Sequence, residues 1–199
     1  MGVLNMEPKE VFGYFEEISS IPRGSGNTQK ISDYLVEFAK NHQLKYVQEP
    51  CGNVIIWKNG TKGYENAPVV ILQGHMDMVC EKDSEAEIDF LKDGLTIQVE
   101  GDEIKAEHTT LGGDDGIALA YGLAILSSDT IEHPPLEVVF TVDEEIGMLG
   151  AAALDMSNLT AKRMINLDSE EDGVVTVSCA GGVDFKMSLP FENCNAVGD

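Results

Sequence analysis

The sequence has no long apolar run and few basic residues, and each absence excludes a class of protein. No stretch approaches the ~20 consecutive apolar residues that a membrane-spanning helix needs. Residues 1–10 lack the basic flank and apolar core of an export signal. The 13 lysines and arginines stand against 35 acids, and the net charge of -22 disfavours binding to a phosphate backbone. We therefore expect a cytoplasmic protein that has neither nucleic acid nor membrane as a partner.

Closely spaced cysteine pairs are also missing. Cys51, Cys80, Cys179 and Cys194 are scattered and form no CxxC motif, which favours free thiols over a disulfide framework. The chain shows no internal repeat, low-complexity tract or proline-rich linker. The sequence pattern changes near residue 180, which predicts a domain boundary there.

Apolar periodicity predicts alternating helices and strands. Helices are expected at 8–20, from an N-cap at Asn27 to about residue 40, at 114–128 and within 148–156. Buried strands are expected at 53–58, 69–72, 136–142, 163–167 and 173–179, and a hairpin at 95–107 turning at Gly101-Asp102. Strands that alternate with helices indicate an α/β layered fold with a mixed or largely parallel sheet.

Acids and one histidine follow several of these strands. The residues concerned are His75 and Asp77 after one strand, Asp143, Glu144 and Glu145 after another, Asp168 after a third, and Asp114 and Asp115 at a helix start. Open α/β sheets bind ligands beyond the carboxyl ends of their strands, so these groups are expected to converge. So many like charges would repel unless a cation neutralised them. Imidazole mixed with carboxylates suits Zn, Mn or Co better than Ca.

Simpler interpretations exist for single residues. Asp115 is equally well explained as a helix cap, and Asp168 as part of a solvated turn. The other three histidines are not expected to bind metal: His42 lies at a helix C-terminus, His108 in a polar loop, and His133 before two prolines.

Four blocks, "GHMDMV", "LGGDDGIALA", "DEEIGMLGA" and "LDSEEDG", occur in this order along the chain. They resemble the signature blocks of the cocatalytic zinc aminopeptidase-like superfamily and, within it, of the aminoacyl-histidine dipeptidase family. The segment "SSIPRGSGNTQKISDYL" is also similar to that family. The resemblance implies a three-layer α/β sandwich with a central mixed, largely parallel sheet. It further implies two divalent cations, zinc or else Mn or Co, a small peptide substrate of the Xaa-His type, and a homodimer.

The resemblance also implies metal ligands. His75 and Asp168 would bind one cation, and Glu145 would bind the other. Asp114 would bridge both, and the peptide bond that follows it is often cis in such enzymes.

Two further acids have implied catalytic roles. Glu144 would be the general base. Asp77 would orient the imidazole of His75 and raise its basicity, because side chains at i and i+2 share one side of a strand.

The sequence departs from the family in one respect, since no histidine follows His133. The family's final histidine ligand is therefore not in this chain. We expect residues 1–180 to form the N-terminal portion of the catalytic domain and 181–199 to begin a lid or dimerisation domain. The 199 residues alone would then bind at most one metal tightly and lack useful activity. An amidohydrolase or deacetylase of N-acyl amino acids, or an inactive metal-binding fragment, remain alternatives.

Overall fold

The computed structural model describes residues 6–169, 171, 173–178, 181–183 and 185–190. The chain divides into two units, Met1–Asp168 and Ser169–Asp199. Among the described residues, every helix and strand lies in the first unit. The expected boundary near residue 180 stays a prediction.

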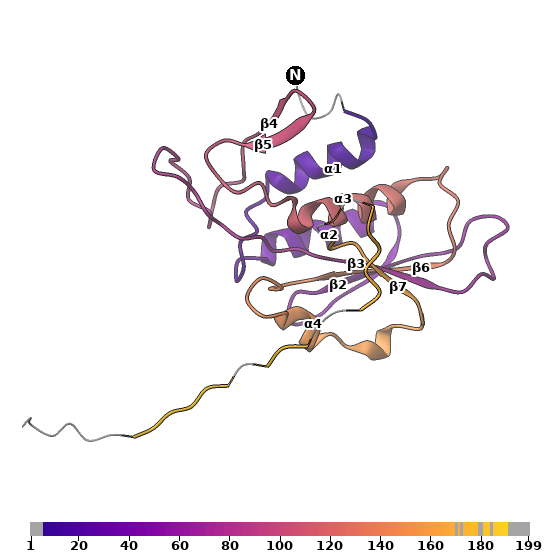
Figure 1. The fold of residues 1–199 in the computed structure, drawn as a ribbon. Helices are drawn as coiled ribbons and strands as arrows, with labels where there is room; N and C mark the ends of the chain where they lie inside the picture. Colours follow the sequence, from indigo (N-terminus) through magenta and orange to yellow (C-terminus); the bar gives the residue numbers. More distant parts are fainter. Residues whose placement is uncertain (1–5, 170, 172, 179–180, 184, 191–199) are drawn as a thin grey trace, which may run out of the picture. The chain divides into compact units, whose positions relative to one another are not determined.

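A five-stranded sheet forms the centre of the first unit (Figure 1). Its strands, in spatial order, are β1 (Lys45–Gln48), β2 (Val54–Lys58), β6 (Leu136–Thr141), β3 (Val70–His75) and β7 (Met164–Asn166). Strand β3 pairs in parallel with both β6 and β7, whereas the β1–β2 and β2–β6 pairs are antiparallel. The predicted α/β fold with a mixed sheet is confirmed, and both parallel pairings involve β3.

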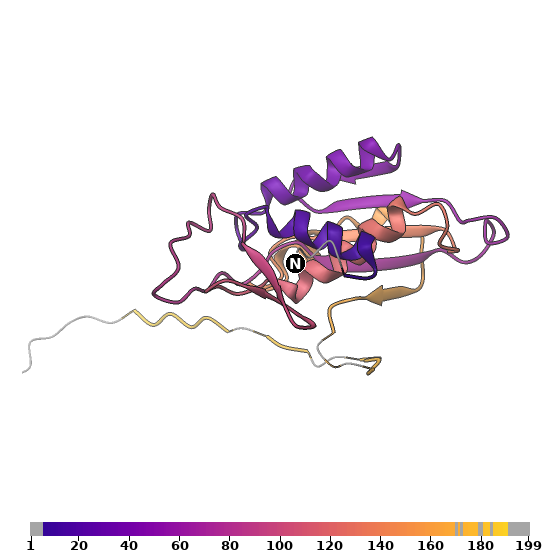
Figure 2. The same cartoon turned by 90° about the horizontal axis from the view of Figure 1, so that it is seen from above.

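Three helices cover one face of this sheet, as Figure 1 and Figure 2 show from two directions. They are α1 (Lys9–Ser19), α2 (Gln29–Asn41) and α3 (Gly113–Ser127). Helix α3 packs between α1 and β3 and is apolar almost all round, as a helix buried on two sides must be. Gly74 permits this close packing, because a Cβ there would lie 2.6 Å from the Cβ of Ala118.

A short helical segment packs against the other face. It contains α4 (Leu149–Ala153) and a 3-10 turn at Met156–Asn158. Leu154 and Leu159 pack there against a small buried cluster from three strands, Ile55, Ile71 and Val139. The buried carboxylate of Glu137 accepts hydrogen bonds from Thr160 and Ala161 and holds the segment to β6. The three layers are thus helices, sheet and this shorter segment.

The predicted hairpin is present as β4 (Ile97–Glu100) and β5 (Glu103–Ala106). Gly101 takes a positive φ of 68° in its turn, a conformation that glycine adopts without strain.

Several local predictions were wrong. Strand β1 was not predicted, because the strand has only four residues and none of them is fully buried. The N-cap of α2 is Thr28 rather than Asn27, whose side-chain amide donates instead to the carbonyls of Phe90 and Leu91. Strand β7 is exposed rather than buried, because it pairs only with β3 among the described strands.

The strand predicted at 173–179 does not form over residues 173–178, and Cys179 lies outside the described residues. Val175 and Val177 are almost fully exposed. Within the part of the chain that the structure covers, no strand pairs with this segment. Its backbone N–H and C=O groups therefore have no neighbouring strand to which they could hydrogen-bond.

Two smaller expectations concern thiols and membranes. Cys51 and Cys80 are free thiols, as predicted, while Cys194 also lies outside the described residues. None of the helices in the described part of the chain combines the length and apolarity needed to cross a bilayer.

Candidate metal centre

The carboxyl ends of the parallel strands bring three predicted ligands together. His75 is the last residue of β3, Asp114 lies in the first turn of α3, and Asp168 follows β7. One ligand atom from each lies within 4.8 Å of the other two. His75 Nε2 is 2.9 Å from Asp114 Oδ1. Asp114 and Asp168, which follow His75 by 39 and 93 residues, therefore lie beside it at one edge of the sheet.

The start of α3 has an irregular backbone that turns its acids toward β3. Asp114 and Asp115 both have non-helical φ/ψ angles, and the peptide bond between them is cis, as the family resemblance implied. The N-cap is Gly112, in a left-handed conformation, so Asp115 is not the cap. Its buried carboxylate instead accepts a hydrogen bond of 3.1 Å from the backbone N–H of His75.

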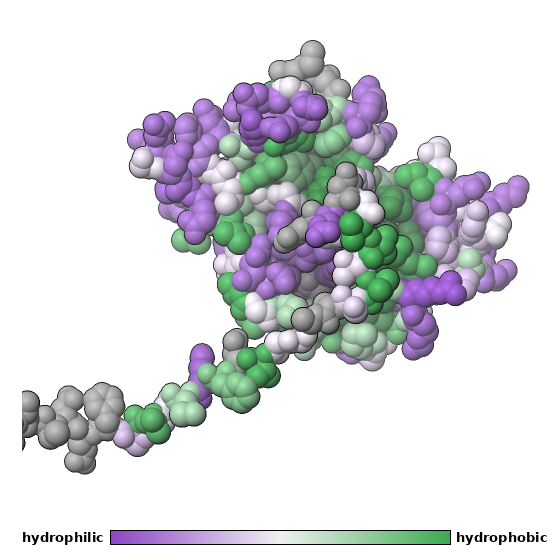
Figure 3. All heavy atoms as spheres, viewed as in Figure 1, coloured by the Kyte–Doolittle hydropathy of each residue, from purple (hydrophilic) through white to green (hydrophobic). Residues whose placement is uncertain are grey.

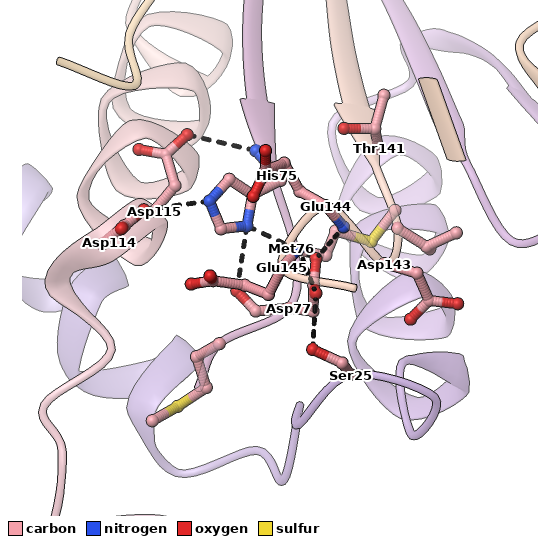
Figure 4. A network of polar contacts seen from close by, with 12 residues as sticks. Ser25, His75, Met76, Asp77, Asp114, Asp115, Thr141, Asp143, Glu144 and Glu145 are labelled. Carbon is pink, nitrogen blue, oxygen red and sulfur yellow. Dashed lines mark hydrogen bonds and ion pairs between the residues drawn. The ribbon is translucent and has the colours of Figure 1, made fainter. Parts of the chain in front are cut away.

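Asp77 lies at the centre of a hydrogen-bond network beside His75 (Figure 4). Its Oδ1 is 3.3 Å from His75 Nδ1 and accepts a hydrogen bond of 2.9 Å from the Glu144 N–H. Its Oδ2 accepts from the Ser25 hydroxyl at 2.8 Å and from the Glu145 N–H at 3.3 Å. Asp77 is fully buried. One carboxylate thus joins the exit of β3 to the loop that follows β6.

These contacts shift two pKa values in opposite directions. Burial disfavours the charged form of both side chains, but the hydrogen bonds outweigh it. Bonds from His75, Glu144 and Ser25 lower the pKa of Asp77 to about 2. Asp77, Asp115 and Asp114 raise the pKa of His75 to about 9. Asp77 is therefore a carboxylate at neutral pH and can fix the orientation of the ring.

The remaining acids are crowded. Burial, with nearby Asp168 and Asp114, raises the pKa of Asp115 to about 7. Burial also raises the pKa of Glu144 and Glu145, and neighbouring carboxylates add to both shifts. Glu145 lies outside the three-residue cluster, although Asp114 is close enough to raise its pKa. Burial is the largest cause of these shifts, and the smaller contributions of neighbouring carboxylates reflect the negative charge gathered here, as at a cation site.

The donor set fits a divalent transition metal. Ligand atoms bind zinc at about 2.0–2.2 Å, so two ligands of one ion lie at most roughly 4.4 Å apart. The 4.8 Å spread of His75, Asp114 and Asp168 is close to that limit. One imidazole and two carboxylates suit zinc, manganese or cobalt.

The other histidines lie elsewhere, as expected. His42 caps α2 and packs its ring 4.3 Å from that of Phe38. His108 is half-exposed and pairs with Asp83. The Nδ1 of the buried His133 is 2.8 Å from its neighbour's carbonyl oxygen.

The sequence interpretation missed two residues that contact this centre, Arg23 and Ser25. Both lie in the loop between α1 and α2, in the segment "SSIPRGSGNTQKISDYL", whose resemblance to the family was noted without assigning roles to its residues. A local signal is the arginine placed between proline and a Gly-Ser-Gly run in "IPRGSGN". Arg23 is 2% exposed, which is rare for an arginine.

Comparisons with known proteins bear on the fold and the relatives of this chain. No family model matches the chain. It is 40% identical over 187 residues to the cytosol non-specific dipeptidase of Escherichia coli, across 94% of this chain and 39% of that protein. It is similar to the crystal structure of aminoacylhistidine dipeptidase from Vibrio alginolyticus, with 38% identity and a TM-score of 0.84 over 87% of this chain and 35% of that one. A tripeptidase from Staphylococcus aureus aligns with 25% identity and a TM-score of 0.70, over 84% of this chain and 45% of that one.

The fold is thus the α/β fold of the aminopeptidases, with its candidate metal centre at the carboxyl edge of the sheet. The chain is homologous to the cytosol non-specific and aminoacylhistidine dipeptidases. It spans about two fifths of the length of the curated relative it matches.

Proposed function

We propose that the protein hydrolyses dipeptides with water activated at two divalent cations. The observation that carries this proposal is the convergence of His75, Asp114 and Asp168 in a chain related to dipeptidases. The proposed substrate is a small peptide of the Xaa-His type. The E. coli relative is named as a cytosolic dipeptidase, which supports a cytosolic location.

The ligands divide between the two ions. His75 and Asp168 would hold the first, Glu145 would hold the second, and Asp114 would contribute to both. Zinc is the proposed metal, with manganese or cobalt as substitutes. The first ion then has three protein ligands in this chain, a usual number for a catalytic zinc. The second has only Asp114 and Glu145, so we expect the 199-residue chain to bind one equivalent tightly.

The chain's own residues then move the proton. When bound, the cations would supply Lewis-acid polarisation of the substrate carbonyl and a lowered pKa for the attacking water. Glu144 accepts the proton of that water on its carboxylate and donates it to the nitrogen of the leaving amine. Asp77 keeps the ring of His75 in place throughout.

This role of Glu144 also separates an enzyme from an inactive metal-binding fragment, since binding alone requires ligands but no additional base. We further propose that the complete protein is a homodimer. The substrate and the dimer are expectations that follow from the family.

Chelation tests the proposal directly. The complete protein should lose dipeptidase activity on removal of metal and recover it with Zn, Mn or Co. A panel of Xaa-His dipeptides, other dipeptides and N-acyl amino acids should show preference for the dipeptides. Full activity in metal-free protein would exclude the metal mechanism, and preference for N-acyl substrates would favour an amidohydrolase.

A further inference from the structure

The loop between α1 and α2 contacts the segments that carry the candidate ligands. Within the four residues from Arg23 to Gly26, Arg23 and Ser25 make these contacts through their side chains and Gly26 through its backbone N–H. None of the four is proposed to bind metal or substrate. Their role rests on what they hold in place.

Arg23 joins the end of β3 to the start of α3. Its Nη1 donates to the carbonyl oxygens of Met76 at 2.9 Å and Asp77 at 3.1 Å. Its Nη2 donates to the carbonyl oxygen of Gly112. These carbonyls lie within two residues of His75 and Asp114. One rigid guanidinium group therefore fixes the spacing between two segments that carry proposed ligands.

Gly112, the N-cap of α3, and Gly116, within the helix, leave space for this guanidinium. A Cβ at either Gly112 or Gly116 would lie 2.5 Å from Arg23 Nη2, too close for a real contact. The irregular start of α3 and the loop arginine are thus packed to fit each other.

Arg23 carries a positive charge although its side chain is buried. Burial lowers the pKa of Arg23 to about 10, while Asp77, Asp115 and Asp114 oppose that change, so the group is a cation at neutral pH. A buried arginine normally pairs with a carboxylate. The hydrogen bonds of Arg23 go to carbonyl oxygens instead, which leaves the nearby carboxylates able to bind a metal.

The next residues extend the same contact. The Ser25 hydroxyl donates to Asp77 Oδ2 at 2.8 Å, and the Gly26 N–H donates to Asp143 Oδ1 at 2.7 Å. Asp143 begins the loop that carries Glu144 and Glu145, and its φ is positive at 54°. The four-residue segment therefore reaches three separate parts of the centre.

We propose that Arg23 is a positioning residue of the metal centre, holding His75 and Asp114 at coordinating distance through the Met76, Asp77 and Gly112 carbonyls, and that Ser25 supports it through Asp77. This inference rests on the proposed function, because it names what pre-arranges the same site. Groups that orient metal ligands typically contribute about 10–100-fold to metal affinity.

The test measures metal affinity and ligand geometry without substrate. Complete protein is titrated with Zn against a chromophoric chelator, and its Co(II) form is examined by visible absorption. Arg23→Met should weaken affinity roughly 10–100-fold and alter the cobalt spectrum. Arg23→Lys should lose less, because lysine keeps the charge and can reach some of the carbonyls, although it lacks the planar fork.

Lys58→Met is the matched control. Lys58 donates from β2 to the carbonyls of Ile125 and Ser128, at the opposite end of the same helix α3. Its loss should lower the thermal midpoint but leave zinc affinity and the cobalt spectrum as in the wild type. A merely structural role for Arg23 would give that same result.

The outcomes separate the two proposals. Unchanged affinity and spectrum in folded Arg23→Met would overturn the positioning role. If that variant fails to fold, Ser25→Ala decides, because it removes a single hydroxyl: reduced zinc affinity supports the inference, and wild-type affinity overturns it. A wild-type protein that binds no divalent cation would overturn the proposed function together with this inference.

Discussion

Two histidines in this molecule are each paired with an aspartate, yet only one lies in a candidate site. His75 Nδ1 is 3.3 Å from Asp77, and His108 Nδ1 is 2.7 Å from Asp83. The exposed pair is the closer one. The side chain of His75 is 1% exposed, whereas that of His108 is 40% exposed. Proximity to an acid is therefore not what distinguishes them.

The groups around the second ring nitrogen, Nε2, distinguish the two histidines. His75 Nε2 faces Asp114, and the Asp168 carboxylate lies in the same cluster. His108 Nε2 is 3.7 Å from the largely exposed Glu85, in a loop and hairpin region rich in hydrophilic side chains (Figure 3). His75 is buried beside Asp77 and Asp115, whereas Asp114 is exposed and Asp168 is half-buried, so a buried imidazole meets acids that are open to a cation. The burial of the histidine and the convergence of several acids on it, rather than the His-Asp pair, indicate the metal.

The largest expected effect comes from removing each histidine in turn. His75→Ala should weaken zinc binding by about 100-fold or more, beyond the usual effect of losing an orienting partner, because a ligand itself is lost. His108→Ala should bind zinc as the wild type does. Calorimetric titration of both variants measures this. Equal affinities would mean that the cluster around His75 is not the metal site.

A more selective effect is expected at the two glutamates beside Asp77. Glu144→Gln in the complete protein should lower turnover on the order of 10²–10⁴-fold and keep metal content, since a positioned base is lost. Glu145→Gln should instead reduce metal content. Dipeptide assays combined with metal analysis distinguish the two. Near-normal turnover of Glu144→Gln would show that another group is the base.

Asp77→Asn separates the orienting carboxylate from the ligands. Asparagine keeps the shape but loses the charge that sits beside His75 and accepts three hydrogen bonds from Ser25, Glu144 and Glu145. We expect a reduction of about 10–100-fold in metal affinity or activity. Asp83→Asn, at the exposed pair, should change neither. If both variants behaved alike in metal titrations, burial would not be the distinguishing property.

The strand ends allowed the centre to be predicted from the sequence. Val69 to Leu72 and Leu136 to Val142 are mainly apolar runs, and His75 and Glu144 follow them within three residues, so the sheet and its acidic edge could be predicted together. The 3.6-residue period gave α1 and α2 in the same way. These features are local in the sequence, and local patterns suffice for them.

Arg23 could not be predicted as part of the centre. Its partners are backbone carbonyls, which have no side-chain signature, and they lie 53 to 89 residues away. Strand β1 has only four half-exposed residues, too few for a clear period. Val175 and Val177 have the composition of a strand, but a strand also requires a partner, which no local pattern reveals.

The smallest effect is expected at Asp83 and His108 themselves. The hydrogen bond and charge of Asp83 raise the pKa of His108, and the same contact lowers the pKa of Asp83. The raised histidine pKa means that the pair stabilises the fold fully below the ordinary value of 6.5 and less as pH rises through the folded value. The lowered aspartate pKa means that this contribution is also lost as acid protonates Asp83. The favourable window thus lies between the two folded pKa values.

In Asp83→Asn the pKa of His108 should fall toward its ordinary value, which NMR titration measures. The thermal midpoint should barely change, because exposed pairs contribute little to stability. A large drop in that midpoint would show that this exposed pair contributes to folding much as buried groups do.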